Sequence, residues 1–309
     1  MAPATAELVG TETERRAVRR KLRDGRRHCV TLRGRTAPRT PRRAGAALTR
    51  VTLCTDSSSL ISPAAAAELG VELVPISVTL DHEPFDGTTD AFYTRMREGA
   101  VATTSVPSPG AFVEVYERAR GGGATSVLSL HLDRRVSGVS EAAALAARET
   151  AIPVHVVSLP TVSYGVGLCV RAAAAALRGG ATASTAAAEA ERIATTLDNV
   201  FVARSAPGGR VPADDEWAIL RFAAGEAAML STHASVEEAT AIMGRRILRG
   251  RPGLVAVGHA GAELEAAADG LAHVLVDAVA AVERYRVTPS VGAHTGPDSF
   301  GAFWWPASR

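Results

Sequence analysis

The chain has 309 residues, 47% of them hydrophobic and 21% charged, which is the composition of a soluble globular protein long enough for two hydrophobic cores. Its formal net charge of +2 is unevenly spread, because residues 1–50 hold 14 Lys and Arg against 4 Asp and Glu, and residues 51–309 hold 20 against 28. The acidic balance of this larger part excludes a broad basic surface for nucleic acid.

The N-terminal segment, residues 1–47, alternates arginine clusters with Thr, Pro, Gly and Ala and shows no sustained apolar period. We expect it to be disordered. No secretory hydrophobic stretch follows its basic residues, and the three cysteines form no Cys-x-x-Cys pair. The longest uncharged run, residues 151–170, contains two prolines, so no stable membrane insertion is expected. These features predict a cytoplasmic protein without a metal site.

Strands and helices alternate in the first half of the chain. Apolar runs predict strands at 51–54, 71–80, 126–132 and 154–159. Helices are predicted at 63–69, 91–98, 109–120 and 140–149. Ser62 and Ser108 are predicted N-caps, each followed by a proline at the first helical position. The alternation indicates an α/β lobe with a mostly parallel sheet, which we assign to residues 48–163.

The second half is less regular. Helices are predicted at 165–177, 184–197, 236–248 and 263–282, and strands at 200–203, 217–222, 227–230, 254–258, 285–291 and 300–305. Consecutive short strands joined by turns, with helices packed on them, are typical of an α+β lobe. We assign this smaller lobe to residues 164–309.

Three hydroxyl-rich segments lie in the first lobe: Asp56-Ser57-Ser58, Thr104 to Ser108, and Val136-Ser137-Gly138. The first and third follow predicted parallel strands, whose carboxyl ends are where ligands bind in open α/β sheets. Hydroxyls beside helix N-termini offer donors and a positive dipole end, which together make an anion site without formal charge. Three independent helix caps would leave the same pattern, and spacing alone does not separate the two interpretations.

These segments belong to a longer ordered set of motifs. The others are Val74-Pro75-Ile76, Phe85-Asp86-Gly87, Val162 to Gly167, Gly208-Gly209-Arg210, and Gly292 to Pro297. With this set, the chain resembles the DegV family of fatty-acid-binding proteins from about Val51 to Pro306. The resemblance implies two lobes with one long-chain fatty acid between them, its tail buried in the smaller lobe. It also implies a carrier without cofactor or catalysis, whose partner is a separate ATP-dependent fatty-acid kinase.

The resemblance further implies roles for single residues. Thr104 or Ser105 and Ser137 would bond the carboxylate, with the Gly138 N–H beside them and His294 lining the head-group side. Asp56, Ser57 and Ser108 would shape the loops. The chain departs from the family pattern where Val139 and Ser140 follow Gly138, and where Asp298 replaces the last glycine of a Gly-Pro-Gly turn. Further departures lie in the second lobe, where Ala203 to Pro207 replaces a longer Leu-rich segment and the family's lysine-proline is not apparent between Asp214 and Ser235. The sequence therefore supports lipid binding more strongly than delivery to a kinase.

Other readings of the sequence remain open. A serine-dependent hydrolase or acyltransferase would use Ser140 or Ser105 with His294. Gly138 to Ala142 resembles the nucleophile elbow of such enzymes, but an elbow follows its strand directly, and here residues 133–137 lie between the two. A nucleic-acid adaptor would act through the arginine-rich residues 1–47. Gly165-x-Gly167 imitates a dinucleotide loop, but close helix packing explains it better.

Overall fold

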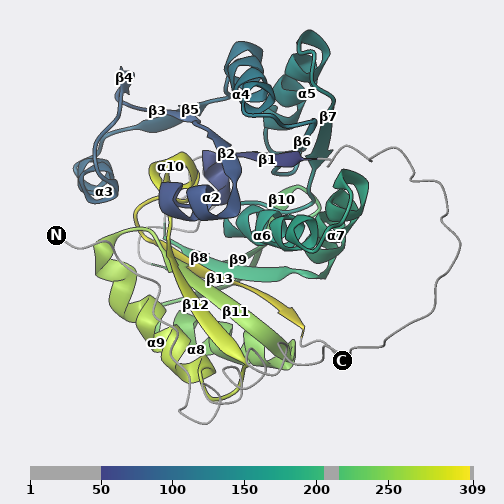
Figure 1. Cartoon of the computed structure of the whole chain (residues 1–309). Coiled ribbons are helices and arrows are strands. Elements are labelled where there is room, and N and C mark those ends of the chain that lie inside the picture. The colour runs from purple at the N-terminus through teal and green to yellow at the C-terminus, as the bar shows by residue number, and fades with distance from the viewer. Residues whose placement is uncertain (1–49, 205–215, 307–309) are drawn as a thin grey trace, which may run out of the picture.

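The computed structural model describes residues 50–204 and 216–306 (Figure 1). The disorder predicted for residues 1–47 and the Gly208-Gly209-Arg210 motif lie outside these ranges. Within them, the fold is the expected mixed α/β arrangement, with a parallel sheet and a separate larger sheet.

The first layer is a four-stranded parallel sheet in the order β2-β1-β6-β7. Its strands are β1 (Val51–Asp56), β2 (Val71–Val74), β6 (Ser126–His131) and β7 (Val154–Ser158). Helices α4 (Pro109–Gly121) and α5 (Val139–Glu149) cover one face, and α6 (Tyr164–Arg178) and α7 (Ala183–Thr196) cover the other (Figure 1). Two predicted N-caps are confirmed, because Ser62 caps α2 (Pro63–Leu69) and Ser108 caps α4 through their hydroxyls.

The second layer is a six-stranded sheet in the order β10-β9-β8-β13-β11-β12, antiparallel except for β11 and β12. Its strands are β8 (Asp198–Ala203), β9 (Trp217–Ala223), β10 (Glu226–His233), β11 (Pro252–His259), β12 (Ala281–Arg286) and β13 (Ser299–Pro306). Helices α8 (Val236–Arg249) and α9 (Glu265–Leu275) cover its outer face with Met243, Ile247 and Leu271. Its inner face turns toward α6 and α7 (Figure 1).

A smaller third unit packs at one side of both layers. It comprises the antiparallel strands β3 (Ser77–Leu80), β4 (Glu83–Pro84) and β5 (Ala102–Ser105), with α3 (Thr89–Arg97) and α10 (Pro289–Thr295). Leu80, Phe92 and Ala293 share its core, and the buried Tyr93 hydroxyl donates to the carbonyl of Val287. The remaining elements are two short turns of helix, η1 (Ser57–Ser59) and η2 (Ala262–Leu264).

Three predicted elements are wrong. The strand predicted at 71–80 is two strands in different sheets, because Pro75 has no N–H to continue a ladder. The helix predicted at 263–282 ends at Leu275, and β12 begins at Ala281 because this segment pairs with β11. The strand predicted at 285–291 stops at Arg286, after which Pro289 begins α10.

The boundary between residues 163 and 164 stays a prediction about domains, but the packing of α6 and α7 bears on it. These two helices follow that boundary, yet their side chains Val166, Cys169 and Ala187 belong to the same buried core as Leu128 of β6. A Cβ atom on Gly167 would clash with the backbone oxygen of Ser59, so this glycine lets α6 approach η1 closely. The close-packing interpretation of Gly165-x-Gly167 is therefore supported.

Candidate functional site

A cavity of about 700 Å³ lies between the carboxyl end of the parallel sheet and the inner face of the six-stranded sheet. Its walls come from elements of all three units, including β5, α5, α10, β8 and β13. The volume is within the usual range for a pocket that encloses a small organic ligand.

All five residues predicted to bind the ligand line this one cavity: Thr104, Ser105, Ser137, Gly138 and His294. The loops meet directly, since a Cβ atom on Gly138 would lie 4.0 Å from Cγ2 of Val106. The third hydroxyl segment reaches the cavity through Ser58. The carboxyl ends of β1 and β6 therefore bring together residues that are distant in the sequence.

Thr104 and His294 connect two sides of the cavity. The Thr104 Oγ1 lies 2.9 Å from the Nε2 of His294, which joins β5 to α10. Burial lowers the pKa of His294 below its ordinary value. The imidazole is therefore neutral near pH 7, and this contact is a hydrogen bond between uncharged groups.

The lowered pKa of His294 predicts acid sensitivity. Because its pKa in the folded protein is lower than its unfolded value of 6.5, the unfolded chain binds more protons, and the free energy of unfolding falls as the pH drops below about 6.5. We expect a lower urea midpoint at pH 5 than at pH 7.5, and a smaller drop in His294→Gln, whose amide keeps a partner for Thr104. An equal drop in both proteins would contradict this assignment.

Two helices begin at the cavity without a side-chain cap. The α5 helix follows Gly138, and α6 follows Ser163, whose φ of 54° is in the left-handed region. Gly138, Val139 and Ser163 all line the cavity. At α6 the N–H groups of Gly165 and Val166 donate to the carbonyls of Val162 and Ser163. At α5 the first backbone N–H groups have no side-chain acceptor and provide donors at the positive end of a helix dipole.

The residues predicted to shape the loops lie just outside the cavity. Ser108 caps α4 through the N–H of Ala111, and the Ser57 Oγ accepts from the N–H of Ile76 at 3.0 Å. One oxygen of the buried Asp56 accepts from the N–H of Ser58, and the other lies 2.7 Å from the Nδ1 of His131. Each of these side chains thus fixes the backbone of a loop that reaches the cavity.

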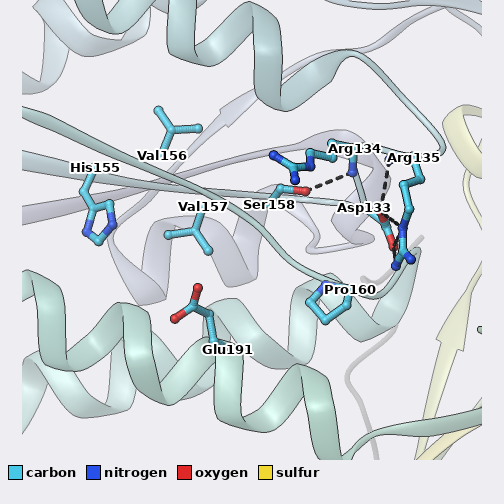
Figure 2. Close-up of a pocket in the computed structure, with 9 residues that line it drawn as sticks. All are labelled: Asp133, Arg134, Arg135, His155, Val156, Val157, Ser158, Pro160 and Glu191. Carbon is cyan, nitrogen blue, oxygen red and sulfur yellow. Dashed lines mark hydrogen bonds and ion pairs between the residues drawn. The ribbon is translucent and has the colours of Figure 1, made fainter. Parts of the chain in front are cut away.

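The segment that leads into Ser137 is held by an ion pair. Figure 2 shows the Arg135 side chain turned back onto Asp133, with its Nε 2.9 Å from Oδ1. Arg135 lowers the pKa of Asp133 by this hydrogen bond. The N–H of Arg134 donates to the Oγ of Ser158 at 2.9 Å, which ties the segment to the end of β7 (Figure 2). A Cβ atom on Gly225 would lie 2.7 Å from Cβ of Arg135, so the β9–β10 turn rests on this arginine.

The same residues border a second hollow of about 500 Å³ beside β7, which also has His155 and Glu191 at its edge (Figure 2). The predicted ligand residues do not line it. In the described part of the chain, no three His, Cys, Asp or Glu side chains gather closely enough to hold a metal ion.

The side of the 700 Å³ cavity formed by the six-stranded sheet is largely apolar. It is lined by side chains of the six-stranded sheet, namely Phe201, Ala203, Leu220, Phe222 and Phe303. The buried amide of Asn199 bonds both the N–H and the carbonyl of Phe222, at 2.8 Å and 2.9 Å, so this polar group is satisfied. Among the described residues that line the cavity, none is Asp, Glu, Lys or Arg. The arrangement suits a long apolar molecule with one polar end.

The serine nucleophiles of the alternative hypothesis are not paired with His294. Ser140 is buried in α5 outside the cavity lining, and its Oγ donates to Glu141 at 3.1 Å. Ser105 lines the cavity, but His294 is hydrogen-bonded to Thr104. A nucleophilic serine needs a base within hydrogen-bonding reach, and the structure places a threonine there instead.

Sequence reasoning missed two residues of this region, Ser58 and His131. The sequence indicates no separate role for Ser58 within its hydroxyl-rich segment, and His131 lies at the end of an apolar strand. The signal that could have found His131 is the alternation of Ser129 and His131 within that strand, because two polar side chains on one face of a buried strand need partners.

Comparison with known proteins adds independent findings. Residues 50–207 match the family model described as an uncharacterised protein of the DegV family. A DegV domain-containing protein of Streptomyces coelicolor is 30% identical over 273 residues, which cover 81% of this chain and 96% of the relative.

Solved structures agree with these sequence matches. One is a DegV family protein of Thermus thermophilus described as fatty acid binding, with 27% identity and a TM-score of 0.74 over 84% of this chain and all of the other. The fold is also shared with DegV of Bacillus subtilis, at 21% identity and a TM-score of 0.71 over 84% of this chain and all of that one. Within residues 50–204 and 216–306, every helix is too short or too polar to traverse a bilayer.

Proposed function

Because the chain belongs to the DegV family, we propose that its cavity binds one long-chain fatty acid. The observation that carries the proposal is the distribution of polarity, with the hydroxyl loops and the uncapped start of α5 on one side of the cavity and apolar side chains of the six-stranded sheet on the other. The fatty acid binding described for the Thermus thermophilus protein supports the same ligand class.

The acyl chain supplies most of the binding free energy in this proposal. Each methylene removed from water contributes roughly 0.8 kcal/mol, so a chain of a dozen or more methylenes outweighs a few neutral hydrogen bonds. The tail would lie against Phe201, Leu220 and Phe222 on the inner face of the six-stranded sheet. The tail therefore retains the ligand, and the polar end orients it.

The carboxyl group would lie where the hydroxyl loops meet. Ser137 and the N–H of Gly138 approach it from the start of α5, and Thr104 or Ser105 from β5. His294 stands beside Thr104 and positions its hydroxyl. These roles follow from the shared cavity and from the absence of a side-chain cap on α5.

We propose that the protein is a cytoplasmic carrier without a catalytic step of its own. The acid it holds would be presented to a separate fatty-acid kinase, which would form the acyl phosphate from ATP. The support for this step is the family resemblance of the hydroxyl loops. Mixing the lipid-loaded protein with such a kinase and ATP should produce acyl phosphate only when both proteins are present.

Native mass spectrometry of the purified full-length protein tests the ligand. We expect one acyl chain per protein, extractable by solvent, and lower occupancy in Ser137→Ala because a head-group donor is lost. A lipid-free protein that also fails to take up added palmitic acid would overturn the proposal. Turnover of activated esters by the purified chain, abolished in Ser105→Ala, would favour the hydrolase instead.

A further inference from the structure

A chain of buried hydrogen bonds runs behind the polar end of the cavity. The Tyr116 hydroxyl lies 3.0 Å from the Ser129 Oγ, which lies 2.8 Å from the Nε2 of His131. The Nδ1 of His131 lies 2.7 Å from an oxygen of Asp56. All four side chains are fully or almost fully buried. The chain therefore exchanges no hydrogen bonds with solvent, and its internal partners decide its directions.

The direction of the bonds to Asp56 follows from the donors and acceptors present. The Asp56 carboxylate receives the N–H and the hydroxyl of Ser58 on one oxygen and the Nδ1–H of His131 on the other, so it acts as an acceptor throughout. The Ser58 hydroxyl proton therefore points toward Asp56.

This arrangement determines what Ser58 offers to the cavity. A serine hydroxyl has one proton, and that of Ser58 is donated to Asp56. Ser58 lines the cavity, so the side of its oxygen that faces the ligand can only accept a hydrogen bond. Ser58 thus differs from Ser105 and Ser137, which have no side-chain hydrogen-bond partner among the described residues and whose protons remain available to a ligand.

Ser58 lies at the polar end of the cavity. The hydroxyl of its neighbour Ser57 accepts from the N–H of Ile76, the residue just before β3, and β3 pairs with β5. The Ser290 hydroxyl donates to the carbonyl of Ser57. Ile76 and Ser290 line the cavity together with Ser105. An acceptor is therefore present among the donors that surround the ligand's head group.

The charges near the hydroxyl loops of the cavity disfavour an ionised carboxyl group on the ligand. The titratable side chains that line the cavity are His294, whose pKa is lowered by desolvation, and Tyr285. Behind them lie the carboxyl groups of Asp56, next to Ser58, and of Glu283, which accepts from the hydroxyl of Tyr164. Without a cation among the described lining residues, these acids oppose ionisation of the ligand, and the dipole of α5 acts in the opposite direction.

We propose that the cavity binds the fatty acid in its protonated form, with the carboxyl O–H donating to the Ser58 Oγ. The carbonyl oxygen of the same group accepts from Ser137 and the N–H of Gly138. This inference rests on the proposed function and specifies the chemical state of the ligand. Asp56 and His131 are positioning residues, because they act on the ligand only through the orientation of Ser58.

Carbon-13 NMR of bound [1-¹³C]palmitic acid tests the protonation state in the intact protein. Between pH 5 and 9, we expect the wild-type complex to show the protonated carboxyl carbon at pH 7 and to ionise only at higher pH. In Ser58→Ala, the lost acceptor should move ionisation to lower pH and weaken binding about five- to tenfold. Ser58→Thr keeps the hydroxyl and should restore the wild-type titration, and the exposed Ser184→Ala should leave it unchanged.

The outcomes separate the two proposals. Bound palmitate that is ionised in the wild-type protein at pH 7 would overturn the protonated form, and a protonated acid with an unchanged titration in Ser58→Ala would overturn the role of Ser58. Failure of the wild-type protein to bind palmitic acid at all would instead reject fatty-acid binding. If Ser58→Ala does not fold, the wild-type spectrum and the Ser58→Thr titration still decide.

Discussion

Replacement of His131 by leucine is expected to lower the free energy of unfolding by about 3 kcal/mol. The leucine removes the partner of one Asp56 oxygen and a partner of the Ser129 hydroxyl, both in fully buried positions. A buried charged group that loses its hydrogen bond cannot recover it from solvent. Urea unfolding at pH 7 measures the change, and an accompanying fall of the thermal midpoint by roughly 5–10 °C is expected.

The matched control for this variant is His155→Leu. His155 is on the neighbouring strand β7, in register with Leu128, and its side chain is exposed. The same chemical change at this position should alter the free energy of unfolding by less than about 0.5 kcal/mol. Similar effects of the two substitutions would show that the buried chain of hydrogen bonds does not stabilise the fold.

The elements predicted correctly are those whose signals are local. Ser62-Pro63 and Ser108-Pro109 carry both the cap and the first helical residue of their helices, so four residues suffice to locate each start. The segment 281–286 has no such signal, because its alanine and valine fit a helix as well as a strand. Its strand forms by pairing with β11, more than twenty residues away, and such pairing is invisible in a local pattern.

The candidate site shows the same division. The hydroxyl segments around Ser57 and Ser137 stand out because they follow predicted parallel strands, and the topology of such strands predicts that they converge. Thr104 and Ser105 stand out only by their place before a helix start, since β5 belongs to the antiparallel sheet. The direction of the Ser58 hydroxyl depends instead on Asp56 and on His131, 75 residues further along the chain. A hydrogen-bond direction of this kind follows only from a list of partners in three dimensions, so sequence reasoning had no access to it.

A bulky side chain at Ala203 should block the tail end of the cavity. Ala203 is 1% exposed and lines the cavity from the end of β8, next to Leu220 and Phe201. In Ala203→Trp, we expect the indole to exclude about four methylenes of a long acyl chain, each worth roughly 0.8 kcal/mol, which weakens palmitic acid binding more than a hundredfold. Competition with a fluorescent fatty acid measures the loss.

Chain length separates a blocked cavity from a misfolded protein. An eight-carbon acid reaches less far along the cavity, so Ala203→Trp should weaken its binding much less than that of palmitic acid, because the hydroxyl loops are unchanged. Ala228→Trp is the matched control, since Ala228 is exposed on β10 and outside the cavity lining, and its variant should bind both acids normally. Equal losses for both acids in Ala203→Trp, or a wild-type affinity for palmitic acid, would place the acyl chain elsewhere than along β8 and β9.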